Sequence, residues 1–145
     1  MVDATSPNWG REPEVVVLED RGGDERGASF SLSQSYLEFL GAPKDMHIAS
    51  ILPGHIRGNH YHAARREIIV VIHGDRWSLH WDRGANTEVS TRAFTGEGVV
   101  AIAVPQNSAH AIRNDGEKPL WLVAATDGIY DPDAPDAYRR IVSQP

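Results

Sequence analysis

Three side chains of the kinds that bind metal ions, His60, His62 and Glu67, lie close together in this sequence. Side chains alternate between the two faces of a β-strand, so His60 and His62 point the same way if they lie on one strand. Glu67 follows an Ala-Ala-Arg-Arg segment at which the chain can turn and begin the next strand. His110, farther along, is a fourth candidate ligand. Two imidazoles and a carboxylate that converge on one point form a transition-metal site.

The sequence contains no cysteine, which excludes thiolate ligands and disulfides. Imidazole and carboxylate groups bind first-row divalent ions, so we expect one divalent transition metal, either Zn, Fe, Mn or Ni. Four protein ligands close the shell of a tetrahedral zinc ion, whereas an octahedral ion keeps open positions for a substrate. Both a catalytic and a structural role of the metal therefore remain open.

Short strands separated by turn signals must position these ligands. Apolar runs predict buried strands, and alternating runs predict strands with one buried face. The expected strands cover residues 15–18, 28–32, 46–52, 68–72, 76–82, 88–94, 99–104, 110–114 and 120–125, with a short helix turn or loop at 34–40 and a helix over 137–142. The fold class is therefore all-β, an antiparallel barrel or jelly roll with a short C-terminal helix or turn.

Several features receive a structural interpretation. We expect residues 68–72 to be buried on both faces of a sheet. Trp77, Leu79 and Trp81 alternate with polar residues and should belong to the core. The acidic, Pro-rich stretch 131–136 could bind a second metal, but a surface turn with Asp136 capping the last helix is favoured. Arg65 and Arg66 could contact a phosphate, although a solvated pair is favoured.

Length and composition limit the classes of function. The chain has 145 residues, which suits one domain over 13–145 after a flexible tail over 1–12. Its net charge of -6 argues against nucleic acid as a partner. No apolar run reaches the roughly 18 residues that a membrane helix needs, and the N-terminus has no apolar signal segment. We therefore expect a cytoplasmic protein.

Residues 54–74 resemble the first sequence motif of the cupin superfamily, including its RmlC-like members. Residues 105–114 resemble the second motif, with Asn107 where the family usually has glycine. Asparagine tolerates positive φ better than most residues, so this turn can be kept. The resemblance implies a small double-stranded β-helix, often a homodimer, with a metal bound near its middle. It also implies that His60, His62, Glu67 and His110 are the ligands.

Residues 24–30, 53–62 and 131–138 are similar to the cupin domain of bifunctional capsular-polysaccharide enzymes that act as nucleotide-sugar epimerase and reductase. The Arg-Gly-Asn-His segment also resembles dTDP-sugar epimerases and ketoisomerases. That resemblance implies that Arg57 binds the nucleotide phosphate, that Asn59 lies at the substrate and that His60 acts as the base. The ketoisomerases usually lack a glutamate at the position of Glu67, so its presence favours the capsule-enzyme branch.

The resemblance implies a nucleotide-sugar epimerase or isomerase of polysaccharide or deoxysugar biosynthesis. Its reaction would be proton abstraction next to a keto group. Since a metal-bound His60 cannot also be a free base, Tyr61 and His80 are further candidates for proton transfer. The sequence has no Gly-rich dinucleotide loop that opens a long helix. We therefore expect a redox-neutral reaction, or a partner that supplies the redox step.

Two other functions use the same ligands. One is a metal-dependent dioxygenase or lyase that acts on a small molecule at an open iron site beside an apolar pocket. The other is a non-catalytic cupin that binds a sugar or holds a structural zinc ion. Oxygen uptake would identify the dioxygenase, and a closed zinc site without turnover would identify the non-catalytic protein.

Overall fold

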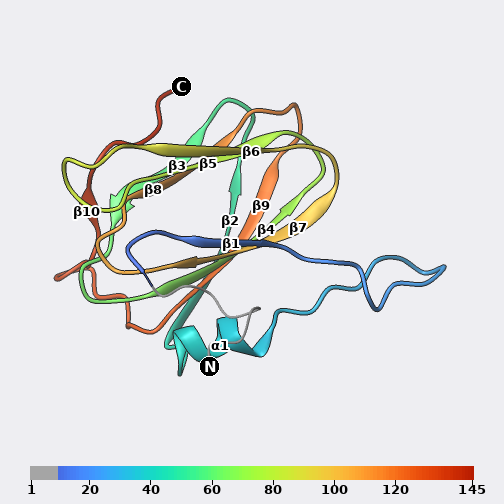
Figure 1. Cartoon of the computed structure of the whole chain (residues 1–145), viewed down its shortest axis with the longest axis horizontal. Helices are drawn as coiled ribbons and strands as arrows, with labels where there is room; N and C mark the ends of the chain where they lie inside the picture. Colours follow the sequence, from blue (N-terminus) through green and yellow to red (C-terminus); the bar gives the residue numbers. More distant parts are fainter. Residues whose placement is uncertain (1–9) are drawn as a thin grey trace.

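Two five-stranded antiparallel sheets face each other in the computed structural model, which describes residues 10–145 (Figure 1). The strand order is β1-β7-β4-β9-β2 in the first sheet and β10-β3-β8-β5-β6 in the second. The strands are β1 Glu14–Val17, β2 Asp45–Ile51, β3 Ile56–Tyr61, β4 Glu67–His73, β5 Trp77–Trp81, β6 Ser90–Phe94, β7 Gly98–Val104, β8 His110–Asn114, β9 Leu120–Thr126 and β10 Tyr138–Arg139. The all-β expectation is confirmed.

The core lies between the two sheets and follows the alternation of their strands. Ile69 and Val71 of β4 face Trp77 and Leu79 of β5 across it, and all of these side chains are buried. The Trp77 ring stacks on Phe94, with ring centroids 4.2 Å apart. The expected core positions of Trp77 and Leu79 are confirmed. Burial of these large apolar surfaces is the main favourable contribution to folding.

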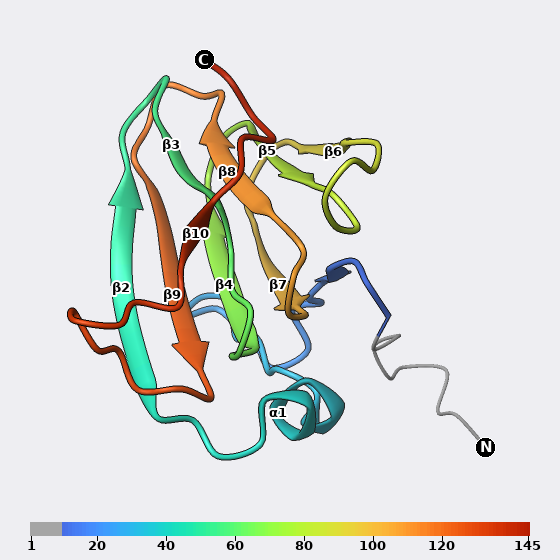
Figure 2. The same cartoon turned by 90° about the vertical axis from the view of Figure 1, so that its left-hand side faces the viewer.

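Helix α1, Gln34–Leu40, covers one end of the outer face of the first sheet (Figure 2). Tyr36, Phe39 and Leu40 pack there in one buried cluster with Ile68, Ala101 and Ala103. A helix of this length does not reach the other end of β4, where Ile72 is 52% exposed. The prediction that residues 68–72 are buried on both faces is therefore wrong at Ile72.

Two predicted elements are absent. Residues 28–32 form no strand, because these exposed and half-buried residues pair with no sheet edge. Residues 137–142 form no helix, and instead Tyr138 and Arg139 of β10 pair with β3. Contacts with Asn59 satisfy the backbone N–H groups of the segment after β10. A short helix is marginal on its own, so these contacts across the chain decide the conformation.

Residues 1–9 of the expected N-terminal tail lie outside the described part of the chain. Farther along this tail, the Glu12 carboxylate accepts hydrogen bonds from the Trp81 and Arg83 side chains, each at 2.9 Å. No helix within residues 10–145 is long and apolar enough to cross a membrane.

The outer face of the first sheet carries exposed apolar side chains beyond the reach of α1. Ile48 of edge strand β2 is 67% exposed and Trp121 of β9 is 52% exposed. Apolar patches of this kind often mark contacts between proteins. The homodimer implied by the resemblance remains a prediction.

Candidate functional site

Three histidines meet at one point, two of them on paired strands and the third directly after a strand. His60 of β3 pairs in register with His110 of β8, and His62 follows directly after β3. One ring nitrogen of each lies within 4.8 Å of those of the other two. His62 and His110 are buried, while His60 is half-buried. The structure thus brings together the three histidines that the sequence singled out, although 48 residues separate His62 from His110.

A β-bulge in β3 determines which of its side chains face this cluster. The pairing with β8 shifts between Gly58 and His60, and the extra residue, Asn59, has a φ of 57°. Gly58 has a φ of 110°, and a Cβ atom there would lie 2.5 Å from the His110 carbonyl oxygen. Only glycine therefore fits at this position. Because a bulge inserts one residue into the alternation, Arg57 and His60 line the same cavity despite their odd spacing.

The rings of His62 and His110 are oriented by main-chain carbonyl groups. His62 Nδ1 donates to the Asp136 carbonyl oxygen at 2.5 Å, and His110 Nδ1 donates to the Ser108 carbonyl oxygen at 3.0 Å. Arg65 Nε also lies 3.4 Å from His62 Nδ1. Because the Asp136 carbonyl oxygen can only accept a hydrogen bond, His62 Nδ1 is the atom that carries the proton. Both Nε2 atoms are buried without a hydrogen-bond partner. In the neutral form of each ring, Nε2 therefore presents a free lone pair, as a metal ligand requires.

Glu67, the first residue of β4, brings a negative charge from the opposite sheet. Its Oε1 lies 3.4 Å from His110 Nε2 and 3.8 Å from His62 Nε2. These are ion-pair distances, and neither Nε2 atom has a hydrogen bond. Burial by itself would raise the pKa of Glu67, but His110 and His62 hold it well below its usual range. Glu67 is therefore a buried carboxylate with its charge directed at the histidines.

The charge states of two histidines follow from the same contacts. Burial, together with His110 and His62, lowers the pKa of His60 to about 4, so this ring is neutral at pH 7. Burial opposes protonation of His62, but Glu67 raises its pKa above the ordinary value. In their neutral forms, imidazole nitrogens beside a carboxylate match the preferences of first-row divalent ions. His60, His62 and His110 could therefore hold such an ion, with the Glu67 carboxylate beside His62 and His110.

The cluster opens into a cavity of about 450 Å³ between the two sheets. This volume is in the range of small-molecule sites. Arg57, Arg65 and His47 are its polar lining residues outside the cluster. The Arg57 side chain is anchored because its Nε donates to the Ser50 carbonyl oxygen at 2.8 Å. The remaining wall is mostly apolar and includes Ala49, Ile56, Ile69, Ile112, Leu122 and Ala124.

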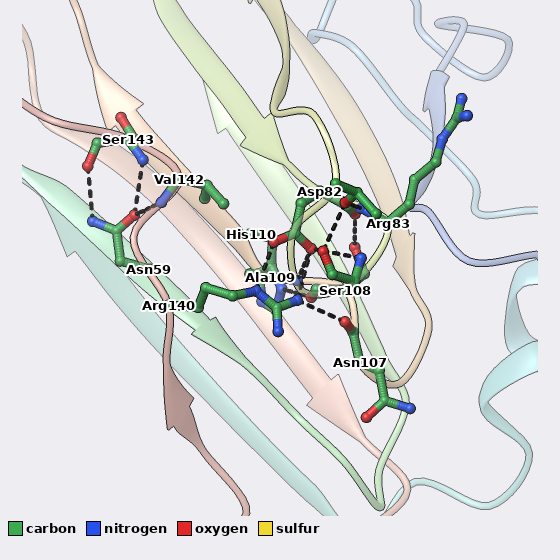
Figure 3. Close-up of polar contacts among 12 residues, drawn as sticks. Asn59, Asp82, Arg83, Asn107, Ser108, Ala109, His110, Arg140, Val142 and Ser143 are labelled. Carbon is green, nitrogen blue, oxygen red and sulfur yellow. Dashed lines mark hydrogen bonds and ion pairs between the residues drawn. The ribbon is translucent and has the colours of Figure 1, made fainter.

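Three other predicted site residues do not line this cavity. The Asn59 side chain bonds the main chain of Val142 and Ser143 at 2.9–3.0 Å and so holds the C-terminal segment (Figure 3). The Tyr61 ring stacks on Tyr138 at 5.3 Å, away from the cluster.

His80, the third of these residues, is enclosed in the second sheet. It is buried between Ser78, at 2.8 Å, and Thr91, at 3.2 Å. Burial lowers the pKa of His80. Of the candidate proton-transfer residues, only His60 lies at the cavity.

His47 is a site residue that the sequence did not single out, whereas Arg65, for which a solvated position was favoured over a phosphate contact, also lines the cavity. His47 lines the cavity from β2 but is itself exposed; on this strand Ala49 and Ile51 face inward, whereas Met46 and Ile48 face outward. The alternation of this strand could have placed His47 on the inner face. Arg65 lies in the turn between β3 and β4, where no such period applies. Its position at the cavity depends on contacts with distant residues.

The predicted turn at Asn107 is present. Asn107 has a φ of 69°, the left-handed conformation for which cupins usually use glycine at this position. Its backbone N–H donates to the His62 carbonyl oxygen at 2.7 Å. This turn therefore ties the second motif to the first.

Comparisons with known proteins identify the family. Residues 23–138 match the model of the polysaccharide biosynthesis C-terminal domain. No curated protein matches the sequence. The capsular polysaccharide assembling protein CapF from Staphylococcus aureus is similar in structure, with a TM-score of 0.60 and 23% identity. That match covers 67% of this chain and 26% of CapF, so the chain spans about a quarter of CapF.

Two further solved structures match over most of their own length. The 3,4-ketoisomerase QdtA from Thermoanaerobacterium thermosaccharolyticum has a TM-score of 0.67 at 12% identity, covering 89% of this chain and 88% of QdtA. The dTDP-6-deoxy-D-glucose-3,5-epimerase RmlC from Legionella pneumophila has a TM-score of 0.67 at 18% identity, covering 89% of this chain and 73% of RmlC. At these identities the likeness concerns the fold. The predicted RmlC-like cupin fold is confirmed, and the chain belongs to the polysaccharide biosynthesis C-terminal domain family.

Proposed function

We propose that this protein is a metal-dependent nucleotide-sugar isomerase or epimerase of polysaccharide or deoxysugar biosynthesis. One observation carries the proposal. The Nε2 atoms of His62 and His110 are buried without partners beside the Glu67 carboxylate, at the wall of a cavity that two arginines line. Buried polar atoms are rarely left without a hydrogen bond, so a cluster of this kind beside a carboxylate favours a bound cation.

The cavity favours a substrate that carries phosphate. Arg57 and Arg65 place two guanidinium groups in its lining, and guanidinium is the side chain best suited to bidentate phosphate binding. The QdtA structure compared above contains TDP-4-keto-6-deoxyglucose, and the RmlC structure contains dTDP-4-keto-L-rhamnose. We infer that a nucleoside diphosphate sugar binds here with its diphosphate at the arginines and its sugar ring toward the histidines.

A divalent ion at this site would supply Lewis-acid polarisation of a keto oxygen. Proton transfer is then the task of an imidazole outside the ligand cluster. His47 is such a residue, and it lies on the first sheet, opposite the strands that carry His60 and His110. We infer that a ring nitrogen of His47 accepts the proton from the carbon beside the keto group. The resulting imidazolium exchanges its proton with solvent. Delivery of a proton to the former keto carbon, together with transfer of the hydroxyl proton of the first carbon to the former keto oxygen, completes an isomerisation without any redox change.

The test uses the whole chain loaded in turn with Zn, Fe, Mn or Ni. Each form is incubated with TDP-4-keto-6-deoxyglucose in D₂O, and deuterium in the sugar is followed by mass spectrometry. We expect metal-dependent incorporation that decreases strongly in His47→Gln. Oxygen consumption instead of exchange would indicate a dioxygenase. A tightly bound zinc ion with no exchange on any sugar nucleotide would indicate a non-catalytic cupin.

The Arg57→Ala variant tests the phosphate contact. Hydrogen bonds to charged groups contribute about 1.5–3 kcal/mol, so kcat/KM should fall roughly 10- to 100-fold. Metal content should stay unchanged, because Arg57 is not a ligand. Arg76→Ala, at an exposed arginine paired with Asp75, is the matched control and should keep wild-type turnover. Full turnover in Arg57→Ala would refute the assigned role.

A further inference from the structure

The C-terminal segment, residues 136–143, lies directly behind the histidine cluster. Its strand β10 pairs with β3, so that Tyr138 is opposite Tyr61 and Arg139 is opposite His60. Ala137 contributes to the wall of the cavity. A segment more than 70 residues away in the sequence therefore borders the strand from which two candidate metal ligands come.

Asp136 contacts the site through both its main chain and its side chain. Its carbonyl oxygen accepts the Nδ1 proton of His62 at 2.5 Å. Its carboxylate accepts the backbone N–H groups of Ala63, Ala64 and Arg65 at 2.9, 2.9 and 3.0 Å. Those three residues form the turn between His62 and Glu67. One residue therefore orients the ring of one ligand and fixes the connection that leads to another.

Independent contacts hold the rest of the segment in place (Figure 3). The Arg140 guanidinium donates to both carboxylate oxygens of Asp82 at 2.7 and 2.8 Å and to the Asn107 carbonyl oxygen at 2.9 Å. The Asn59 side chain bonds the main chain of Val142 and Ser143. The segment that carries Asp136 is thus held in place by contacts on its C-terminal side, and Asp136 can contact the turn before Glu67.

We propose that Asp136 is a positioning residue of the metal centre. It keeps the proton of His62 on Nδ1, so that Nε2 stays free, and it holds the turn that sets the distance from His62 to Glu67. This inference rests on the proposed metal site. The acidic stretch 131–136 then acts through Asp136, which contacts His62 and the turn before Glu67 and does not itself bind the ion. Loss of such an outer contact typically weakens metal affinity 10- to 100-fold.

The test compares Asp136→Asn with the wild-type full chain after removal of metal. The amide replaces one acceptor oxygen by a donor, so at least one N–H group of the turn loses its partner. Affinity is measured by titration with Co²⁺ and Zn²⁺, and the His62 tautomer in the metal-free chain by ¹⁵N NMR. We expect affinity to fall about 10- to 100-fold and His62 to populate the Nε2–H tautomer.

Asp133→Asn is the matched control, since it removes the same charge from an exposed position of the same stretch. It should leave affinity and tautomer unchanged. Should Asp136→Asn not fold, Asp136→Glu keeps the charge while it displaces the carboxylate, and the same results are expected to a smaller degree. A lower melting temperature with unchanged affinity and tautomer would overturn the inference.

Failure of the metal site itself gives a different result. If the wild-type chain binds neither Co²⁺ nor Zn²⁺, the proposed function fails. The tautomer comparison in the metal-free chains still decides whether Asp136 positions His62.

Discussion

At the scale of single residues, the two nitrogens of each imidazole decide what the ring can do. His62 and His110 each use Nδ1 for a main-chain carbonyl and keep Nε2 free toward the cavity. His80 is equally buried, but both of its nitrogens face hydroxyl groups, those of Ser78 and Thr91. The same residue type is thus a candidate ligand in one place and a structural side chain in another.

The His80→Gln variant tests this distinction. Because His80 does not line the cavity, we expect metal affinity and deuterium exchange to stay at the wild-type level. The loss of its hydrogen bonds should cost about 1 kcal/mol of unfolding free energy. Urea unfolding and Co²⁺ titration measure the two quantities. A variant that folds and binds metal but has lost exchange would restore His80 as a proton-transfer residue.

At the scale of elements, the β3 bulge and the turns around it decide which side chains reach the cavity. The bulge places Arg57 and His60 on one side, and the Asn107 turn joins the two motifs. The Asp82 carboxylate accepts two bonds from Arg140 and further bonds from the backbone N–H groups of Ala109 and Gly84. This ion pair, in which Asp82 is buried and Arg140 is partly exposed, connects the C-terminal segment to the start of β8.

The Asp82 pair predicts a pH dependence of stability. Burial alone would raise the pKa of Asp82, but Arg140 and the backbone N–H groups hold it below its usual value. A depressed carboxyl pKa stabilises the fold above the unfolded-state pKa, near 4, and this stabilisation is lost as the pH falls through the folded-state pKa.

Asp82→Asn should therefore lose about 1.5–3 kcal/mol of unfolding free energy at pH 7, and its difference from wild type should shrink near pH 3. Urea unfolding at the two pH values measures this difference. Asp24→Asn, which breaks an exposed pair with Arg26, should change little at either pH. An equal loss at pH 7 and pH 3 would contradict the assigned charge of Asp82.

At the scale of the whole molecule, the candidate ligands connect the two sheets. His60 and His110 belong to the second sheet, whereas Glu67 belongs to the first. A bound ion would therefore link the two layers across the open end of the core. Ligands that bind only the native state stabilise it by mass action.

Removal of metal by a chelator should consequently lower the melting temperature. At a free metal concentration 100 times the Kd, binding contributes about 2.7 kcal/mol. For a chain of this size we expect a decrease of roughly 5–10 °C, reversed by added metal. Calorimetry of the chelated and reloaded protein measures the shift. His110→Ala should melt at one temperature under both conditions, and a wild-type chain that behaves in the same way would argue against a metal that links the sheets.

The sequence by itself determined most of the strands, the core of β4 and β5, and the identity of the histidines that meet. These features depend on local alternation and on side-chain types, which can be read along the chain. The alternation along β2 also indicates that His47 lies on the inner face of its sheet, although His47 was not among the predicted site residues.

Only the tertiary structure decided the surroundings of the site. In the structure, Asn59, Tyr61 and His80 lie outside the cavity. Strand β10 stands where the last helix was expected, and Asp136 lies next to His62. The conformation of residues 136–143 depends on hydrogen bonds with partners some 60 to 80 residues away, which no local pattern encodes. Types and periods are local properties of the chain, whereas the partner of a buried polar group is a property of the fold.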